Sequence, residues 1–147
     1  MDFLAAEVLL KARLKGRLPP TVQVLSQIEV AAEGARQVTP AVHVVYGGAA
    51  LVDQAAGAAK LEQTWLTVVA VRATNDPTGE TARRAAGVLM TTLLQSLLGW
   101  RPPAQPDGLQ LSPLAPADPL APSVVDGVLY LPAAWVTTCV VRGIDDD

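Results

Sequence analysis

The side chains that most often carry out catalysis are scarce in this sequence. It contains one histidine, His43, and one cysteine, Cys139. A general base needs an orienting group and a nucleophile within reach, and the sequence neighbours of His43 supply neither. One histidine and one cysteine also fall short of the four ligands of a structural zinc site. We therefore predict that His43 lies within a sheet, and that Cys139, which alternates with Trp135 and Val141, is a small buried hydrophobic residue.

Motifs for phosphate, calcium and nucleic-acid binding are incomplete as well. Gly47 and Gly48 resemble a fragment of a phosphate-binding loop, but no Walker lysine follows them. The acidic residues stand singly apart from residues 145–147, which excludes a calcium loop. The aromatic residues are not interleaved with Arg or Lys, as a single-strand binding platform requires. A carboxylate pair for acid–base catalysis could still assemble in three dimensions from Glu29, Asp53, Glu62 and Asp126. We predict a protein that is not an enzyme and that binds no metal and no cofactor.

The composition indicates instead that the chain buries surface against partners. Half of the 147 residues are apolar, 17% are charged and the net charge is −3. These values exclude a disordered chain and a nucleic-acid binder driven by bulk charge, and the single cysteine excludes a disulfide-stapled secreted domain. A chain this small and this apolar is expected to form a homo-oligomer, because exposed apolar surface requires a partner. The alternative is a monomer that is simply rich in alanine and valine.

Neither a membrane span nor an export signal is predicted. A span needs about 20 mostly apolar residues in a row. The two longest stretches without charge, residues 37–52 and 85–100, are shorter than this and contain polar residues and glycine. Basic residues from Lys11 to Arg17 interrupt the apolar run near the N-terminus. We expect a soluble chain in the cytoplasm of its host.

Hydrophobic periodicity predicts two main helices and several strands. Apolar residues recur at helical spacing over residues 2–17 and 81–98. Asp76 is the predicted N-cap of the second helix, Pro77 its first residue and Gly99 its C-terminal cap. Runs rich in β-branched residues predict strands at 22–29, 41–46, 61–74, 109–111, 124–131 and 134–142, with the last two joined around Pro132. The order α-β-β-β-α-β-β-β favours an α+β fold with a mostly antiparallel sheet flanked by the two helices.

The segments between these elements carry the predicted contacts with partners. Gly47 and Gly48 are expected to end a strand, and residues 49–59 are expected to form a flexible loop or the approach to the next strand. Residues 102–122 hold seven of the twelve prolines. We interpret them as a constrained connector within a single domain of residues 1–147, followed by an acidic tail at 145–147. The candidate interface residues in the loop and the connector are Gly48, Ala49, Leu51, Val52, Asp53, Gln54, Leu114 and Leu120.

Four features of the sequence resemble bacteriophage tail terminator proteins, in particular the minor tail family of Mu-like phages. They are the N-terminal amphipathic helix that ends before Pro19-Pro20, the run Thr39-Pro40-Ala41-Val42-His43-Val44, the run Gln63-Thr64-Trp65 leading into Val68, Val69 and Val71, and the helix end Leu97-Leu98-Gly99-Trp100-Arg101-Pro102 before the connector. Together these features cover nearly the whole chain, and none of them is a catalytic motif.

The resemblance implies a structural virion protein, assembled in the host cytoplasm. Such proteins close the head-proximal end of the tail tube, commonly as a hexameric ring, end its elongation and present a surface for head attachment. The implied partners are further copies of the chain, the tail tube protein, a head–tail connector or head completion protein, and genomic DNA that passes through the ring without sequence-specific binding. An acidic lumen would repel this DNA, and the candidate residues for it are Asp145, Asp146 and Asp147.

Two other functions stay open from the sequence. A head completion or connector protein of the same particle would also form a ring. A small α+β domain could instead bind a ligand or act as an enzyme through a pocket lined by its valine-rich strands. This last alternative predicts a stable monomer with one enclosed pocket.

Overall fold

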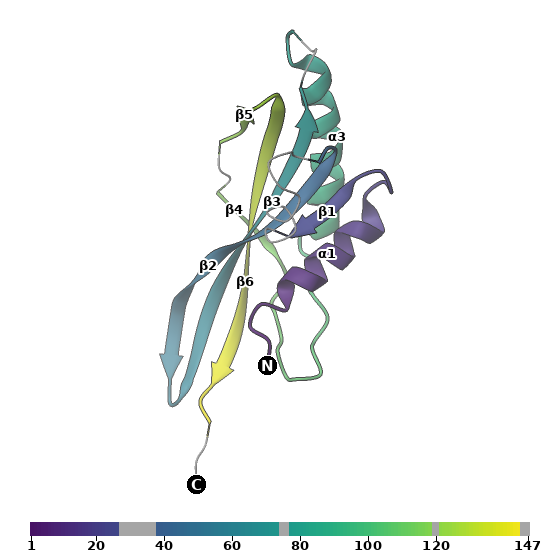
Figure 1. Cartoon of the computed structure of the whole chain (residues 1–147). Helices are drawn as coiled ribbons and strands as arrows, with labels where there is room; N and C mark the ends of the chain where they lie inside the picture. Colours follow the sequence, from purple (N-terminus) through teal and green to yellow (C-terminus); the bar gives the residue numbers. More distant parts are fainter. Residues whose placement is uncertain (27–37, 74–76, 119–120, 145–147) are drawn as a thin grey trace.

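The structure is a computed structural model that describes residues 1–26, 38–73, 77–118 and 121–144. Helices and one sheet make up the regular structure of these residues (Figure 1). In chain order the elements are α1 (Ala6–Arg17), β1 (Gln23–Ser26), β2 (Ala41–Ala55), β3 (Ala58–Arg72), α3 (Glu80–Leu97), β4 (Ala115–Ala117), β5 (Ser123–Val125) and β6 (Val128–Arg142). The α+β class and the order of elements predicted from the sequence are confirmed.

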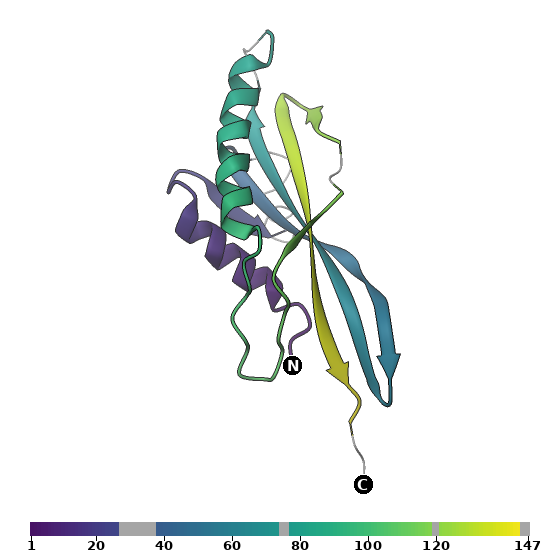
Figure 2. The ribbon, with the colours of Figure 1, turned by 180° about the vertical axis from the view of Figure 1, so that it is seen from behind.

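Three long strands form the frame of the sheet. The strand order is β1-β2-β3-β6-β4, and β5 pairs with another part of β6. All pairs are antiparallel except β1 with β2, which is parallel. β2, β3 and β6 have 15 residues each. At roughly 3.3 Å per residue, each of them spans about 50 Å. These strands run through the length of the molecule, and the other elements attach to them (Figures 1 and 2).

Both helices pack against one face of this sheet (Figure 2). Their buried residues recur every three or four positions, as an amphipathic helix requires. They are Ala6, Leu10 and Leu14 in α1, and Ala82, Ala86, Leu89, Leu93 and Leu97 in α3. The strands contribute alternate residues to the same core, because successive side chains of a strand point to opposite faces. Among them are Val24, Val42, Val44, Trp65, Val69, Ala133, Trp135 and Cys139.

Two tryptophans lie at the centre of the core. Trp65 of β3 and Trp135 of β6 are cross-strand neighbours, and both are 0% exposed. The indole Nε1 of Trp65 donates to Gln63 Oε1 at 2.9 Å, and Gln63 Nε2 donates to the Phe3 carbonyl at 2.6 Å. Nε1 of Trp135 donates to the Thr67 hydroxyl at 2.9 Å, and that hydroxyl donates on to a backbone carbonyl. Both buried indole N–H groups therefore have the partners that their burial requires.

The prediction for residues 47–59 is wrong. Gly47 and Gly48 do not end a strand, because β2 continues through them and turns directly into β3. The register of β2 against β3 shifts at this point, so the two glycines form a β-bulge, with Gly48 at a φ of 103°. Gly47 has little room for a side chain, since an added Cβ would lie 3.2 Å from Thr64. Residues 49–59 are thus part of a long β-hairpin and not a loop.

The predictions around β6 also need correction. Pro132 does not separate two strands, because β6 runs through it without a break. A proline cannot donate to a ladder, and the outer edge of β6 is unpaired at this point: β5 pairs with residues 128–130 and β4 with residues 134–136. The strand expected at 109–111 does not form. Leu109 and Leu111 instead bury their side chains in the core, and the short strand β4 comes later.

The start of α3 differs from the prediction by a few residues. The helix begins at Glu80, and Gly79 before it adopts a φ of 69°. Pro77 is therefore not the first helical residue, and the predicted cap Asp76 lies outside the described residues. The Thr78 hydroxyl accepts a hydrogen bond from the Glu80 N–H at 3.3 Å. At the other end, Gly99 has a φ of 71°, as predicted for a glycine that follows a helix.

Candidate assembly surfaces

One part of the sheet extends beyond both helices (Figures 1 and 2). It consists of residues 47–62 of the β2–β3 hairpin and residues 138–144 at and after the end of β6, and we call it the arm. A two-residue turn at Ala56 and Gly57, with φ values of 42° and 81°, joins the two hairpin strands. Every residue from 49 to 57 is exposed. The arm therefore offers a large surface on which a partner could bind.

Large apolar side chains are exposed on the arm. Leu51 is 59% exposed, Val52 52% and Val140 44%. Leu51 is the cross-strand partner of Leu61, which in turn is the partner of the buried Cys139 of β6. A row of apolar residues thus continues from the core onto the surface of the arm. Single exposed apolar residues are ordinary, but a contiguous row is a candidate contact surface.

The opposite face of the arm is charged. Asp53 of β2 and Lys60 of β3 are cross-strand partners. Glu62 follows two residues after Lys60 and therefore lies on the same face. Val140 of β6 is the cross-strand partner of Lys60, so this face carries an exposed valine beside its charged side chains.

Both outer edges of the arm lack a neighbouring strand in the described part of the chain. β1 pairs with β2 only over Ala41–Val44, and β4 reaches no farther along β6 than Val136. Beyond that point, the Ser112 N–H of the connector donates to the Thr138 carbonyl at 3.0 Å. Unpaired backbone N–H and C=O groups of an edge strand are a template for pairing with another chain.

The structure brings six of the predicted interface residues together on the β2 strand of the arm. They are Gly48, Ala49, Leu51, Val52, Asp53 and Gln54. Their contact with a partner stays a prediction. Sequence reasoning missed Val140 and Ile144, which is 91% exposed. The signal was present, because the expected burial of Cys139 and Val141 places Val140 on the opposite face of its strand.

Leu114 is not available for such a contact, and its assignment to an interface is wrong. It is 2% exposed, its N–H donates to the Trp100 carbonyl at 2.9 Å, and its carbonyl accepts from the Gly99 N–H at 3.0 Å. With Leu109 and Leu111 it packs into the core, which removes its apolar surface from water. The other predicted site residues lie outside the described residues: Leu120, Asp145, Asp146 and Asp147.

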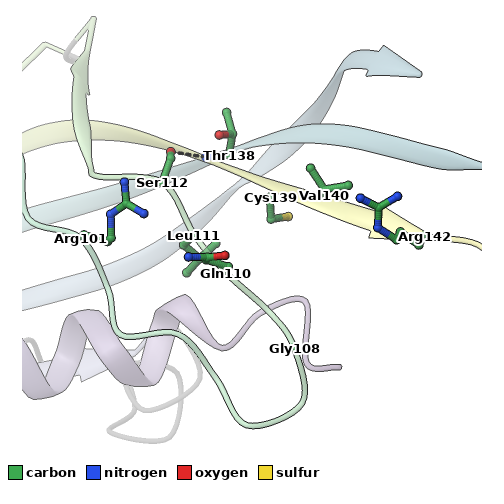
Figure 3. A pocket seen from close by; sticks show the side chains of 9 residues that line it. All are labelled: Arg101, Gly108, Gln110, Leu111, Ser112, Thr138, Cys139, Val140 and Arg142. Carbon is green, nitrogen blue, oxygen red and sulfur yellow. Dashed lines mark hydrogen bonds between the residues drawn. The ribbon is translucent and has the colours of Figure 1, made fainter. Parts of the chain in front are cut away.

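A hollow of about 430 Å³ lies between the connector and the end of β6 (Figure 3). Arg101 and Arg142 line it at opposite ends, and the polar side chains of Gln110, Ser112 and Thr138 also line it. The Thr138 N–H donates to the Ser112 hydroxyl at 2.8 Å, which holds the connector against β6. Neither guanidinium has a hydrogen-bond or ion-pair partner among the described residues. Two unpaired cations in one hollow favour an anionic ligand.

Other features of the described residues are less distinctive. A second hollow of about 230 Å³ lies between the start of α3 and β5. In residues 1–26, 38–73, 77–118 and 121–144, no group of three or more His, Cys, Asp or Glu side chains could hold a metal ion. None of the helices in these ranges is long and apolar enough to cross a membrane.

His43 and Cys139 both lie in strands, as predicted, and both are buried. His43 of β2 is 7% exposed, and its ring centroid lies 6.4 Å from that of Tyr130. Burial lowers the pKa of its imidazole below the ordinary value near 6.5. Cys139 of β6 is 3% exposed, and burial raises the pKa of its thiol. The thiol therefore stays protonated at neutral pH, and a protonated thiol is a poor nucleophile.

Protonation of His43 is expected to destabilise the fold in mild acid. Because the pKa of His43 is lower in the folded state, the unfolded chain binds the proton more readily. The free energy of unfolding therefore falls as the pH is lowered through 6.5 toward the folded-state pKa. Thermal unfolding between about pH 7.5 and about pH 5.5 measures this fall, and the His43→Gln variant should lose this part of it. An identical pH dependence in the variant would show that other groups cause it.

The chain is matched over nearly its whole length both by a sequence family and by a solved fold. The sequence profile of the family described as Phage tail terminator protein matches residues 1–145. A solved structure with 18% sequence identity covers 97% of this chain and 94% of its own, with a TM-score of 0.51, and this likeness shows the fold alone. No curated protein matches the chain significantly in sequence. The chain therefore belongs to the phage tail terminator protein family: it is a structural component of the virion that caps the tail tube and stops its elongation, and it is not an enzyme.

Proposed function

We propose that this tail terminator acts as a hexameric ring at the head-proximal end of the tail tube, in the manner of the minor tail proteins of Mu-like phages. The ring presents one side to the tail tube protein and the other to a head–tail connector or head completion protein. Genomic DNA passes through its opening without sequence-specific binding. The four sequence features shared with the Mu-like group support that narrower assignment, and a single domain of residues 1–147 forms each subunit.

The arm is the observation that carries this proposal. Its β2 side exposes Leu51 and Val52, and its β6 side borders the hollow beside the connector. Ring closure needs two unlike patches on each subunit, so that one patch contacts the other patch of the next subunit. The two sides of the arm provide such a pair, and the apolar row provides area that a stable contact buries. We assign Gly48, Ala49, Asp53 and Gln54 to the same contact.

The position of the tail aspartates is a separate part of the proposal. Asp145, Asp146 and Asp147 carry the densest negative charge of the sequence. Displayed at the opening of the ring, they would repel the DNA phosphates and keep the passage from binding the genome.

Tail assembly in a phage that lacks this chain tests the proposed location and the ring. Without the chain, tubes should be longer than wild type and carry no heads, and supplying the chain in trans should restore both properties. Immunogold labelling should place it at the head–tail joint, and native mass spectrometry of the complex released from that joint should show a hexamer. Label on heads that lack tails would favour a head completion protein instead. Label at the distal tip would contradict the proposed location.

A further inference from the structure

The edge of β6 beside the hollow offers unpaired backbone groups. The carbonyl of Thr138 accepts from the Ser112 N–H and its N–H donates to the Ser112 hydroxyl, so both groups of Thr138 point away from β3. The N–H and C=O groups of successive residues alternate in direction along a strand. Those of Val140 and Arg142 therefore point toward the hollow as well, and no described residue pairs with them. A further strand could pair at this edge.

The side chains of the hollow define the charge that such a strand should carry. Arg101 and Arg142 lie at its two ends, on either side of the stretch of β6 that begins at Thr138 (Figure 3). From residue 138 to residue 142 this stretch is about 13 Å long, at roughly 3.3 Å per residue. Guanidinium groups pair best with carboxylates or phosphates. A ligand that satisfies both arginines and the backbone edge is an extended peptide with more than one carboxylate.

We propose that the hollow binds residues 144–147 of a neighbouring copy of the chain, Ile-Asp-Asp-Asp, as an additional strand on the edge of β6. The proposal rests on the ring proposed above, which brings the end of β6 of one copy beside the next copy. Residues 145–147 span about 10 Å when extended, which is close to the length of the hollow along β6. Their backbone pairs with Val140 and Arg142, and their carboxylates meet the two guanidinium groups.

The backbone of the same copy's tail cannot reach the Thr138 end of the hollow. The Gly143 N–H donates to the Gly57 carbonyl at 2.7 Å, so the chain at this point is still bound to the β3 side of the arm. From Ile144, the next three residues reach at most about 11 Å. The Thr138 end of the hollow lies six residues back along β6, from 144 to 138, which is about 20 Å. In this arrangement the aspartates pair with arginines of a neighbouring copy and do not face the DNA. The tail contact and the acidic lumen proposed above are therefore alternative roles for the same three aspartates.

A labelled peptide tests the contact directly. The probe is a fluorescent peptide of residues 144–147 with capped ends, and the receiver is the full chain with Asp145→Asn, Asp146→Asn and Asp147→Asn, so that its own tails do not compete. Fluorescence anisotropy should show binding that weakens with salt. Adding Arg101→Gln and Arg142→Gln to the receiver should weaken binding by about tenfold or more. The matched control, Arg83→Gln with Arg84→Gln, removes two exposed arginines from α3 and should leave the affinity unchanged.

Assembly of the full chain provides a second, independent readout. By light scattering, the triple asparagine variant should need about tenfold more protein than wild type to form the ring. Exchanging the charges, by adding Arg101→Glu and Arg142→Glu to a chain with Asp145→Lys, Asp146→Lys and Asp147→Lys, should restore assembly.

The outcomes separate this contact from the ring itself. One result overturns the tail contact and leaves the ring in place: wild type and the asparagine variant form rings equally well, and the two arginine substitutions do not change peptide binding. If wild type forms no ring but peptide binding depends on the arginines, the contact stands and the ring fails. A single-stranded oligothymidylate that displaces the peptide and binds more tightly would assign the hollow to nucleic acid and overturn the proposal.

Discussion

Replacing both Leu51 and Val52 by aspartate is expected to abolish capping of the tail tube without unfolding the chain. Both side chains are more than half exposed, so the two substitutions together should change the free energy of unfolding by no more than about 1 kcal/mol. In a contact with a partner, however, the two carboxylates would be removed from water without a partner for their charge, which is costly. Tubes assembled with the variant should grow past the wild-type length, as measured by electron microscopy.

A matched pair of valines provides the control. Val124 and Val125 are adjacent residues of β5 and are 65% and 53% exposed, close to the values for Leu51 and Val52. Replacing both by aspartate introduces the same charge on another exposed strand, away from the arm. Tubes should then keep the wild-type length. If the variant with aspartates at 51 and 52 also stops tubes at the wild-type length, the arm is not the capping element.

Replacing Trp65 by alanine is expected to lower the free energy of unfolding by about 3–5 kcal/mol, as for other large aromatic residues in protein cores. Trp65 is 0% exposed and packs between Tyr46 of β2 and Trp135 of β6, its two cross-strand partners. The substitution leaves a cavity at the centre of the sheet and removes the donor to Gln63. Urea unfolding followed by circular dichroism measures the difference from wild type.

Two phenylalanine variants separate hydrogen bonding from packing. Trp65→Phe leaves Gln63 Oε1 without its indole donor in the core, which should cost about 1–3 kcal/mol beyond the loss of ring area. Trp135→Phe leaves the Thr67 hydroxyl still donating to the Ala133 carbonyl at 3.2 Å. The first variant should therefore be the less stable of the two. Equal losses would show that the Gln63 bond contributes little.

The helices and the centre of the sheet could be predicted from the sequence because their patterns are regular. Leu89, Leu93 and Leu97 recur at helical spacing, and the alternation through Trp65, Thr67 and Val69 is that of a strand. Such patterns arise because one face of each element is buried, and they identify the element whatever its partners are. The same logic placed His43 and Cys139 in buried strand positions.

The arm could not be predicted in this way because its pattern comes from pairing and not from burial. Residues 49–57 are mostly small and are all exposed, so no alternation of apolar and polar residues marks them as a strand. They are extended because β3 continues beside them and supplies a partner for their backbone. Pro132 was expected to separate two strands. The strand continues through it because its missing N–H falls on a stretch of the β6 edge that has no neighbouring strand.

Most residues of the candidate contact surface could be chosen from the sequence, but their arrangement on one strand of a hairpin could not. Six of the eight residues chosen from the loop and connector lie on one strand of the arm, whereas Leu114 is buried. The choice rested on a small, flexible segment and a proline-rich connector that were both expected outside regular elements, and apolar residues of such segments occur in the core as well as on contact surfaces. The hollow with Arg101 and Arg142 could not be foreseen, because 41 positions separate these residues and only the fold brings them together.

The continuity of the three long strands gives the molecule a definite mechanical response. β3 and β6 pair without a register shift from the part of the sheet beneath the helices to the arm. The hydrogen bonds between these two strands therefore lie across the long axis of the strands. A force that pulls the arm along this axis loads these bonds together, in shear, and does not open them one at a time. The subunit should therefore resist tension between the tube and the rest of the particle better than a fold whose strands are pulled apart from their ends.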